Sequence, residues 1–139
     1  MTKRVLFICT GNSARSQMAE GLLKSIGKSE FKVFSAGTHP MPVRPQAVQV
    51  MKEIGIDISD QYSKTLDGFV DQPFDYVITV CDNAKESCPV FYGTKQTLHW
   101  SIEDPVGVLG TEEMRLQAFR KARDEIARRI GETFGLARS

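Results

Sequence analysis

A cysteine, an arginine and a serine lie close together near the start of the chain, in the segment Cys9-Thr-Gly-Asn-Ser-Ala-Arg15-Ser16. An apolar run precedes this segment and a helical pattern follows it, so its backbone N–H groups should surround an anion at the positive end of a helix. Gly11 allows close bending, and Arg15 offers a planar fork for a tetrahedral oxyanion. Because the same positive field stabilises a thiolate, we predict a nucleophilic Cys9 that accepts a hydrogen bond from the Ser16 hydroxyl.

The sequence of this segment does not match two other kinds of active site. No histidine adjoins Cys9, so it is not part of a cysteine–histidine dyad, and the glycine and lysine spacing of the Walker motif is absent. A glycine-containing turn with a buried structural cysteine is the alternative, but the combined spacing of Cys9, Arg15 and Ser16 favours function. The residues that we expect to bind the oxyanion are Thr10, Gly11, Asn12, Ser13, Ala14 and Arg15.

Two further cysteines occur in the segment that begins at Cys81 and ends at Cys88-Pro89. Their spacing, with only His39 and His99 elsewhere, matches no common zinc pattern, so we expect no metal; inert packing cysteines are the stronger alternative. If residues 82–88 are helical, the two cysteines lie about 10 Å apart along the axis. A disulfide needs Cα atoms within about 7 Å, so these cysteines could pair only if the segment unwinds.

A carboxylic acid is also available, in Glu103-Asp104-Pro105. Pro105 holds the preceding residue extended, which would place Asp104 at the sheet edge near Cys9. Attack of a thiolate on a tetrahedral oxyanion expels an oxygen that needs a proton, and a carboxylic acid can supply it. An ordinary Asp-Pro turn is the alternative for these residues taken by themselves.

Alternating strand and helix patterns predict the scaffold that positions these groups. They indicate one α/β domain over residues 1–139, a doubly wound four-stranded parallel sheet of order 2-1-3-4 with helices on both faces. Cys9 ends the first strand and Cys81 follows the third, so the two cysteines should emerge close together at the switch point. The predicted strands cover residues 4–8, 31–35, 74–80 and 97–100. Helices are predicted over residues 16–26 and 45–54, and a last helix is predicted after Thr111. In the helix at 45–54, the side chains expected to face inward are Ala47, Val48, Met51 and Ile54.

Composition narrows the class of protein further. The 139 residues include 18 Lys and Arg and 17 Asp and Glu, and this net charge of +1 argues against a nucleic-acid partner. No apolar run approaches the ~20 residues of a membrane span, and the apolar stretch at 5–9 is too short for a signal peptide. Three cysteines do not form a secreted disulfide framework. We therefore expect a cytoplasmic monomer that has no membrane partner.

These motifs resemble the low-molecular-weight protein tyrosine phosphatase superfamily, and more closely the thioredoxin-coupled arsenate reductases built on that fold. Both groups share the cysteine–arginine loop, and the pair Cys81 and Cys88 points to the reductases. The resemblance covers essentially the whole chain, in Cys9–Met18, Ser35-Ala-Gly37, Gly55-Ile-Asp-Ile-Ser59, Cys81 with Cys88-Pro89, and His99-Trp100 through Asp104-Pro105.

The resemblance implies an activity in arsenical detoxification and a role for each cysteine. Cys9 attacks arsenate, and Asp104 protonates the departing oxygen. Cys81 then attacks Cys9, which releases arsenite and forms a Cys9–Cys81 disulfide. Cys88 attacks Cys81, and thioredoxin reduces the resulting redox-active Cys81–Cys88 disulfide. No bound cofactor is implied.

The chain departs from many relatives at two places. Where they carry a second loop cysteine, this chain has Ala14, which removes a side disulfide with Cys9. Some relatives also bind potassium behind the loop, and there we expect the Lys64 ammonium to take the place of the ion and the activity to be insensitive to potassium. An exposed loop lysine is the alternative. The positions that match the potassium site are Asn12, Glu20, Ser35, Tyr62 and Lys64.

Two other functions remain open from the residues. A phosphatase would use the same loop and Asp104 unchanged, but Val106-Gly107 follows where phosphatases usually place aromatic residues. An arsenite sensor is the other, with three thiolates that capture arsenic without turnover. It would need Cys9, Cys81 and Cys88 to converge at once, which the helical spacing disfavours.

Overall fold

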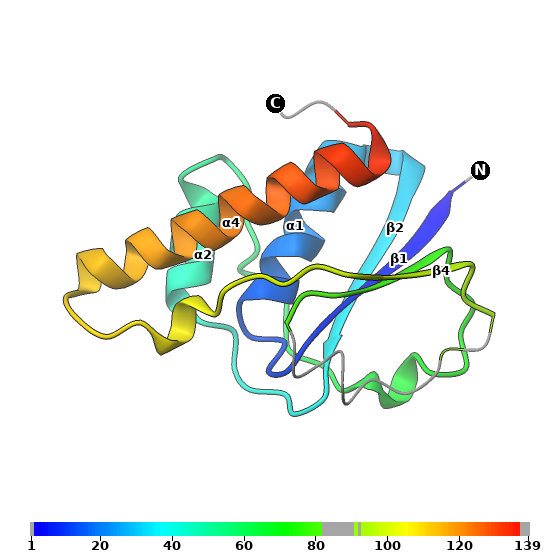
Figure 1. The fold of residues 1–139 in the computed structure, drawn as a ribbon, viewed down its shortest axis with the longest axis horizontal. Coiled ribbons are helices and arrows are strands. Elements are labelled where there is room, and N and C mark those ends of the chain that lie inside the picture. Colours follow the sequence, from blue (N-terminus) through cyan, green and yellow to red (C-terminus); the bar gives the residue numbers. More distant parts are fainter. Residues whose placement is uncertain (1, 82–90, 92, 137–139) are drawn as a thin grey trace.

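A computed structural model describes residues 2–81, 91 and 93–136. Its central element is a sheet whose strands all run parallel, in the order β2-β1-β3-β4 (Figure 1). This order confirms the predicted 2-1-3-4 topology, and it makes β1 and β3 neighbours. The strands are β1 (Lys3–Cys9), β2 (Phe31–Gly37), β3 (Tyr76–Thr79) and β4 (Gln96–His99).

Three α-helices occur in the described part of the chain: α1 (Arg15–Gly27), α2 (Pro45–Lys52) and α4 (Glu112–Phe134). The last begins where the sequence predicts it, because the Thr111 hydroxyl accepts a hydrogen bond of 3.2 Å from the Met114 N–H and caps the helix. The described residues also contain three short 3-10 turns. They are η1 (Lys28–Glu30), η2 (Leu66–Gly68) and η3 (Pro105–Gly107).

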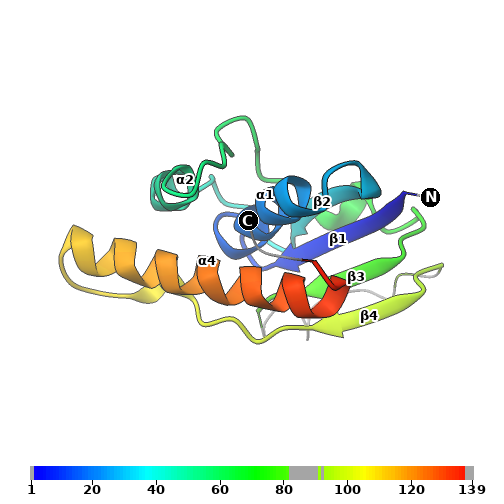
Figure 2. The ribbon, with the colours of Figure 1, turned by 90° about the horizontal axis from the view of Figure 1, so that it is seen from above.

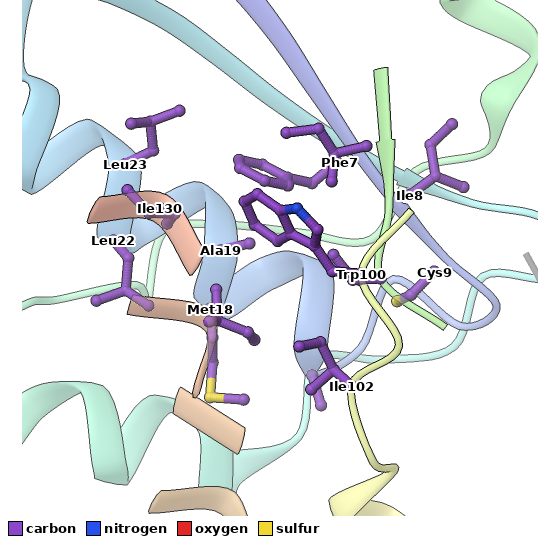
Figure 3. Close-up of a cluster of buried hydrophobic side chains, with 14 of the residues drawn as sticks. Phe7, Ile8, Cys9, Met18, Ala19, Leu22, Leu23, Trp100, Ile102 and Ile130 are labelled. Atoms are coloured by element: carbon purple, nitrogen blue, oxygen red, sulfur yellow. The ribbon is translucent and has the colours of Figure 1, made fainter. Parts of the chain in front are cut away.

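One face of the sheet packs against α1 and α4 (Figure 2). Phe7 of β1 contacts the buried Trp100 there, with ring centroids 5.8 Å apart, so Trp100 is part of the core. Figure 3 shows these rings with Met18 and Ala19 of α1, and with Cys9 at the edge of the same cluster. Because the side chains around it are buried, β1 is a rigid support for the cysteine at its end.

In the part of the chain that the structure describes, the opposite face carries aromatic side chains. Phe34 of β2 packs against Phe69 and Phe74, and Phe74 in turn packs against Phe91. The Arg4 guanidinium lies 4.9 Å from the centre of the Phe34 ring, in cation–π contact. The short turn η2 precedes Phe69 and lies over this face (Figure 1).

One expectation about a helix end is wrong in detail. Helix α2 ends at Lys52, and the chain turns over residues 53–55, so Ile54 is 45% exposed and Val50 is buried instead. Helix α1 ends at Gly27, and the next residue, Lys28, has a positive φ of 51°. Gly27 is needed for space, since a Cβ there would lie 2.3 Å from the Phe31 ring.

No helix in the described residues is long and apolar enough to cross a membrane.

Candidate active site

The two described cysteines lie at the carboxyl ends of neighbouring strands. Cys9 ends β1, and Cys81 follows the adjacent strand β3 by two residues. Both side chains are buried. The N–H and the hydroxyl of Thr10 each lie 3.3 Å from the Cys81 sulfur, so Cys81 touches the residue that follows Cys9. The third cysteine, Cys88, and the expected helix at 82–88 lie outside the described residues.

The Cys9 sulfur is surrounded by hydrogen-bond donors. The Asn12 N–H donates to it at 3.2 Å, and the Ser16 hydroxyl lies 2.8 Å away. The Asn12 side-chain NH2 donates to the Ser16 oxygen at 2.8 Å, and the Lys64 N–H donates to the Asn12 side-chain carbonyl, which fixes the amide orientation. Ser16 therefore accepts from Asn12 and has its proton free for the sulfur. Two such donors can stabilise the negative charge that a sulfur nucleophile carries when it attacks.

The carbonyl groups of the loop turn away from its centre. In a trans peptide the C=O and the next N–H point in opposite directions, so outward carbonyls leave the N–H groups of Gly11, Asn12 and Ala14 facing inward. The result is a ring of donors suited to an oxyanion. Segment 39–44 provides the outer partners: the N–H groups of His39, Met41 and Arg44 donate to the carbonyls of Thr10, Gly11 and Ser13, each at 2.8 Å.

Asn12 has a backbone conformation that few residues adopt, with φ of 48°. Its carbonyl accepts hydrogen bonds from the Gln17 side chain at 3.0 Å and from the Ser63 hydroxyl at 2.7 Å. Sequence reasoning missed Gln17 and Ser63 as parts of the site. A signal for Gln17 was present, since it is a polar residue within the apolar stretch of the first helix.

The end of β2 passes so close to the loop that only glycine fits there. A Cβ on Gly37 would lie 2.7 Å from the Thr10 carbonyl oxygen and 2.9 Å from the Asn12 nitrogen, both backbone atoms. We expect Gly37→Ala to displace the loop and to weaken phosphate binding about tenfold or more, because a small misplacement disrupts several donors together. Protection of Cys9 from alkylation by inorganic phosphate measures this affinity.

Gly68→Ala is the matched control, since a Cβ at Gly68 meets nothing within 4 Å. It should bind phosphate like the wild type. Unchanged phosphate protection in Gly37→Ala would show that the loop does not depend on this close approach.

Arg15 and Asp104 face each other at the mouth of the loop. One Arg15 nitrogen donates to the Ile102 carbonyl at 2.9 Å, and another lies 3.7 Å from an Asp104 carboxylate oxygen. The Arg15 side chain is 13% exposed and the Asp104 side chain 52%, so the arginine is set in place while the carboxyl group meets solvent. The Val106 N–H donates to Asp104 at 2.9 Å, which fixes the turn at η3.

A buried carboxylate lies behind the loop. Glu20 accepts a hydrogen bond of 2.6 Å from the Ser35 hydroxyl and pairs with Lys24 and with Lys64, whose ammonium is 4.0 Å away. Lys64 also donates to the Tyr62 carbonyl at 2.7 Å. Burial lowers the pKa of Lys64, and the Glu20 carboxylate opposes that shift. The described residues contain no group of three or more His, Cys, Asp or Glu side chains arranged to hold a metal.

The sequence from residue 4 to residue 135 matches the family described as low molecular weight phosphotyrosine protein phosphatase. Together with the parallel sheet and the cysteine–arginine loop, this match shows that the chain belongs to that family.

Within the family, the chain is similar to several proteins named arsenate reductase. The chain is 48% identical over 131 residues to an arsenate reductase of Halalkalibacterium halodurans and 44% identical over 130 residues to one of Bacillus subtilis, in each case over 94% of both chains. An arsenate reductase structure in a phosphate-binding state is 35% identical, with a TM-score of 0.83 over 96% of this chain and 98% of that one. A thioredoxin-dependent arsenate reductase of Corynebacterium glutamicum is 33% identical, with a TM-score of 0.74 over 96% of this chain and 61% of that one.

Proposed function

We propose that this chain reduces arsenate to arsenite with thiol reductant. The observation that carries the proposal is the contact between the second cysteine, Cys81, and Thr10 beside the nucleophile. Hydrolysis of a phosphoester needs a single cysteine, whereas reduction needs a second thiol within reach of the first. The curated relatives named arsenate reductase support the same activity.

In the first step the Cys9 thiolate attacks the arsenic of bound arsenate. The inward N–H groups and Arg15 bind the oxyanion oxygens, and the donors from Asn12 and Ser16 stabilise the sulfur before attack. An As–S bond forms and an As–O bond breaks. The departing oxygen takes a proton from Asp104, which lies across the mouth of the loop from Arg15, and leaves as water.

In the second step Cys81 attacks the Cys9 sulfur. The As–S bond breaks, its electron pair stays on arsenic, and arsenic(V) becomes arsenite while two thiols become a disulfide. Thr10 supports this step, because its N–H and hydroxyl can both donate to the Cys81 sulfur and hold it in position beside Cys9.

The third step regenerates the nucleophile. Cys88 attacks Cys81 and frees Cys9, and a dithiol protein of the thioredoxin class reduces the Cys81–Cys88 disulfide through a mixed disulfide. The thioredoxin-dependent relative from Corynebacterium glutamicum supports this choice of reductant. Such chemistry requires a reducing compartment, so we place the protein in the cytoplasm.

Phosphatase activity is the second candidate, because the family match is to phosphotyrosine phosphatases. The loop and Asp104 could act on a phosphoester without change. However, the turn after Asp104 contains Val106 and Gly107 rather than aromatic residues that could stack on a tyrosine ring. We therefore expect only weak hydrolysis of aryl phosphates.

Arsenate-dependent oxidation of NADPH, with thioredoxin and thioredoxin reductase present, tests the proposed function. The wild type should turn over repeatedly, and Cys9→Ser should show no activity. Hydrolysis of an aryl phosphate without any arsenate-dependent NADPH oxidation would assign the chain to the phosphatases instead. Stoichiometric arsenite binding without turnover would assign it to the sensors.

The position of Lys64 predicts that catalysis is insensitive to potassium. Its ammonium lies beside Glu20 and the Tyr62 carbonyl, where a potassium ion would face a fixed positive charge. The wild-type rate should be equal in potassium and sodium buffers of the same ionic strength. In Lys64→Met we expect potassium to raise the rate several-fold over sodium, because the Glu20 carboxylate then lacks this cation.

Lys24→Met is the control for that experiment. It also removes a cation from Glu20, but one whose side chain is half exposed and on helix α1. It should remain insensitive to potassium. A several-fold gain of the wild type in potassium would refute the assignment of Lys64.

A further inference from the structure

Gln17 is a fully buried amide on helix α1 that none of the chemical steps above uses. A buried amide is costly unless its donors and acceptors are satisfied. Its NH2 group donates to the Asn12 carbonyl and to the Tyr62 carbonyl, each at 3.0 Å. Its carbonyl oxygen accepts from the Gln61 side chain at 2.8 Å. Both hydrogens and the oxygen of the amide therefore have partners, and these partners fix its orientation.

The hydrogen bond from Gln17 to Asn12 helps to set which way a loop peptide faces. The Asn12 carbonyl and the Ser13 N–H belong to one peptide group and point in opposite directions. Because Gln17 and the Ser63 hydroxyl, at 2.7 Å, both hold the carbonyl on the outside, the Ser13 N–H is directed into the ring of donors. Asn12 has its left-handed conformation here, and such a conformation persists where surrounding contacts hold it.

The second hydrogen bond ties the loop to the segment that supports it. The Tyr62 carbonyl accepts from Gln17 and also from the Lys64 ammonium. The Lys64 N–H in turn donates to the Asn12 side chain at 2.9 Å. Gln17 thus joins helix α1, the anion loop and residues 61–64 through one side chain.

We propose that Gln17 is a positioning residue for oxyanion binding: its amide holds the Asn12–Ser13 peptide so that the Ser13 N–H points at the bound oxyanion. It touches neither the substrate nor the Cys9 sulfur and acts through Asn12. The inference deepens the proposed function and rests on it where arsenate is concerned, whereas binding of phosphate to the same loop does not depend on arsenate reduction.

Two substitutions of Gln17 distinguish the effect of its hydrogen bonds from the effect of its side-chain shape. Gln17→Met has a similar length and removes both donors. Gln17→Glu keeps the shape and places an oxygen against the Asn12 and Tyr62 carbonyl oxygens. In each variant we expect affinity for inorganic phosphate, measured by protection of Cys9 from iodoacetamide, to fall about tenfold, as for loss of one well-placed hydrogen bond. The KM for arsenate should rise by a similar factor with a smaller change in kcat, since the lost donor binds ground state and transition state alike.

Ile130→Val and Ile130→Ala serve as controls for lost stability. Ile130 is buried on α4 one turn before Phe134, which packs on Phe31 and Tyr76 at the opposite edge of the sheet. Of these two variants, the control is the one whose melting temperature falls by the same amount as that of Gln17→Met. Its phosphate affinity should stay within about twofold of the wild-type value.

Phosphate affinity of Gln17→Met within twofold of the wild type would overturn the proposal, and so would an equal loss in the Ile130 control. If Gln17→Glu does not fold, Gln17→Met alone decides. If the proposed function itself is wrong, the wild type will show no arsenate turnover. The phosphate measurements would still decide the role of Gln17 in that case.

Discussion

The Cys88→Ser variant is expected to reduce a single equivalent of arsenate and then stop, with Cys9 and Cys81 joined in a disulfide. The contact of Cys81 with Thr10 brings the second thiol beside the nucleophile, so release of arsenite does not need the third cysteine. Regeneration of Cys9 does need it, because no other cysteine is present to attack Cys81. Repeated turnover with thioredoxin should therefore be abolished, whereas the first turnover should remain.

Arsenite yield per protein and peptide mapping under non-reducing conditions measure both parts of this result. Cys81→Ser is the control, since it should accumulate no Cys9–Cys81 disulfide and release no arsenite in the presence of thioredoxin. Normal cycling of Cys88→Ser with thioredoxin would show that the order of the relay is wrong.

Replacement of Asp104 by asparagine should lower kcat/KM for arsenate by about 10²–10⁴-fold, the usual loss when a general acid is removed. The asparagine side-chain carbonyl can still accept from the Val106 N–H, so the turn at η3 is kept. It cannot transfer a proton to the departing oxygen. The effect should appear in the formation of the Cys9 adduct, measured in single-turnover experiments, and leave phosphate binding largely intact.

Glu103→Gln provides the matched control for this variant. Glu103 is the adjacent carboxylate, its side chain is 81% exposed, and its described ion pair is a long contact of 3.9 Å with Lys121. Its loss should change the rate by less than about twofold, as for a surface charge. Equal losses in the two variants would mean that the region needs negative charge rather than a proton donor at Asp104.

Much of the scaffold follows from local patterns in the sequence. The apolar run of β1 predicts a central strand, and the alternation of strands and helices predicts the parallel order that brings Cys9 and Cys81 to one edge. Thr111 and the two acidic residues after it mark the start of α4 correctly. These features could be read because they depend on residue type and spacing over one or two turns of chain.

Residue types and their local spacing therefore predict the sheet, the location of the cysteine–arginine loop and the chemistry that its side chains allow. Contacts between distant segments set the direction of each loop carbonyl, the conformation of Asn12 and the partners of Gln17. They also leave Ile54 exposed, where the helical pattern predicts an inward side chain. The physical reason is separation along the chain. The hydrogen bonds that orient the loop come from segments 39–44 and 61–64, and no periodicity within residues 9–16 carries information about partners so distant.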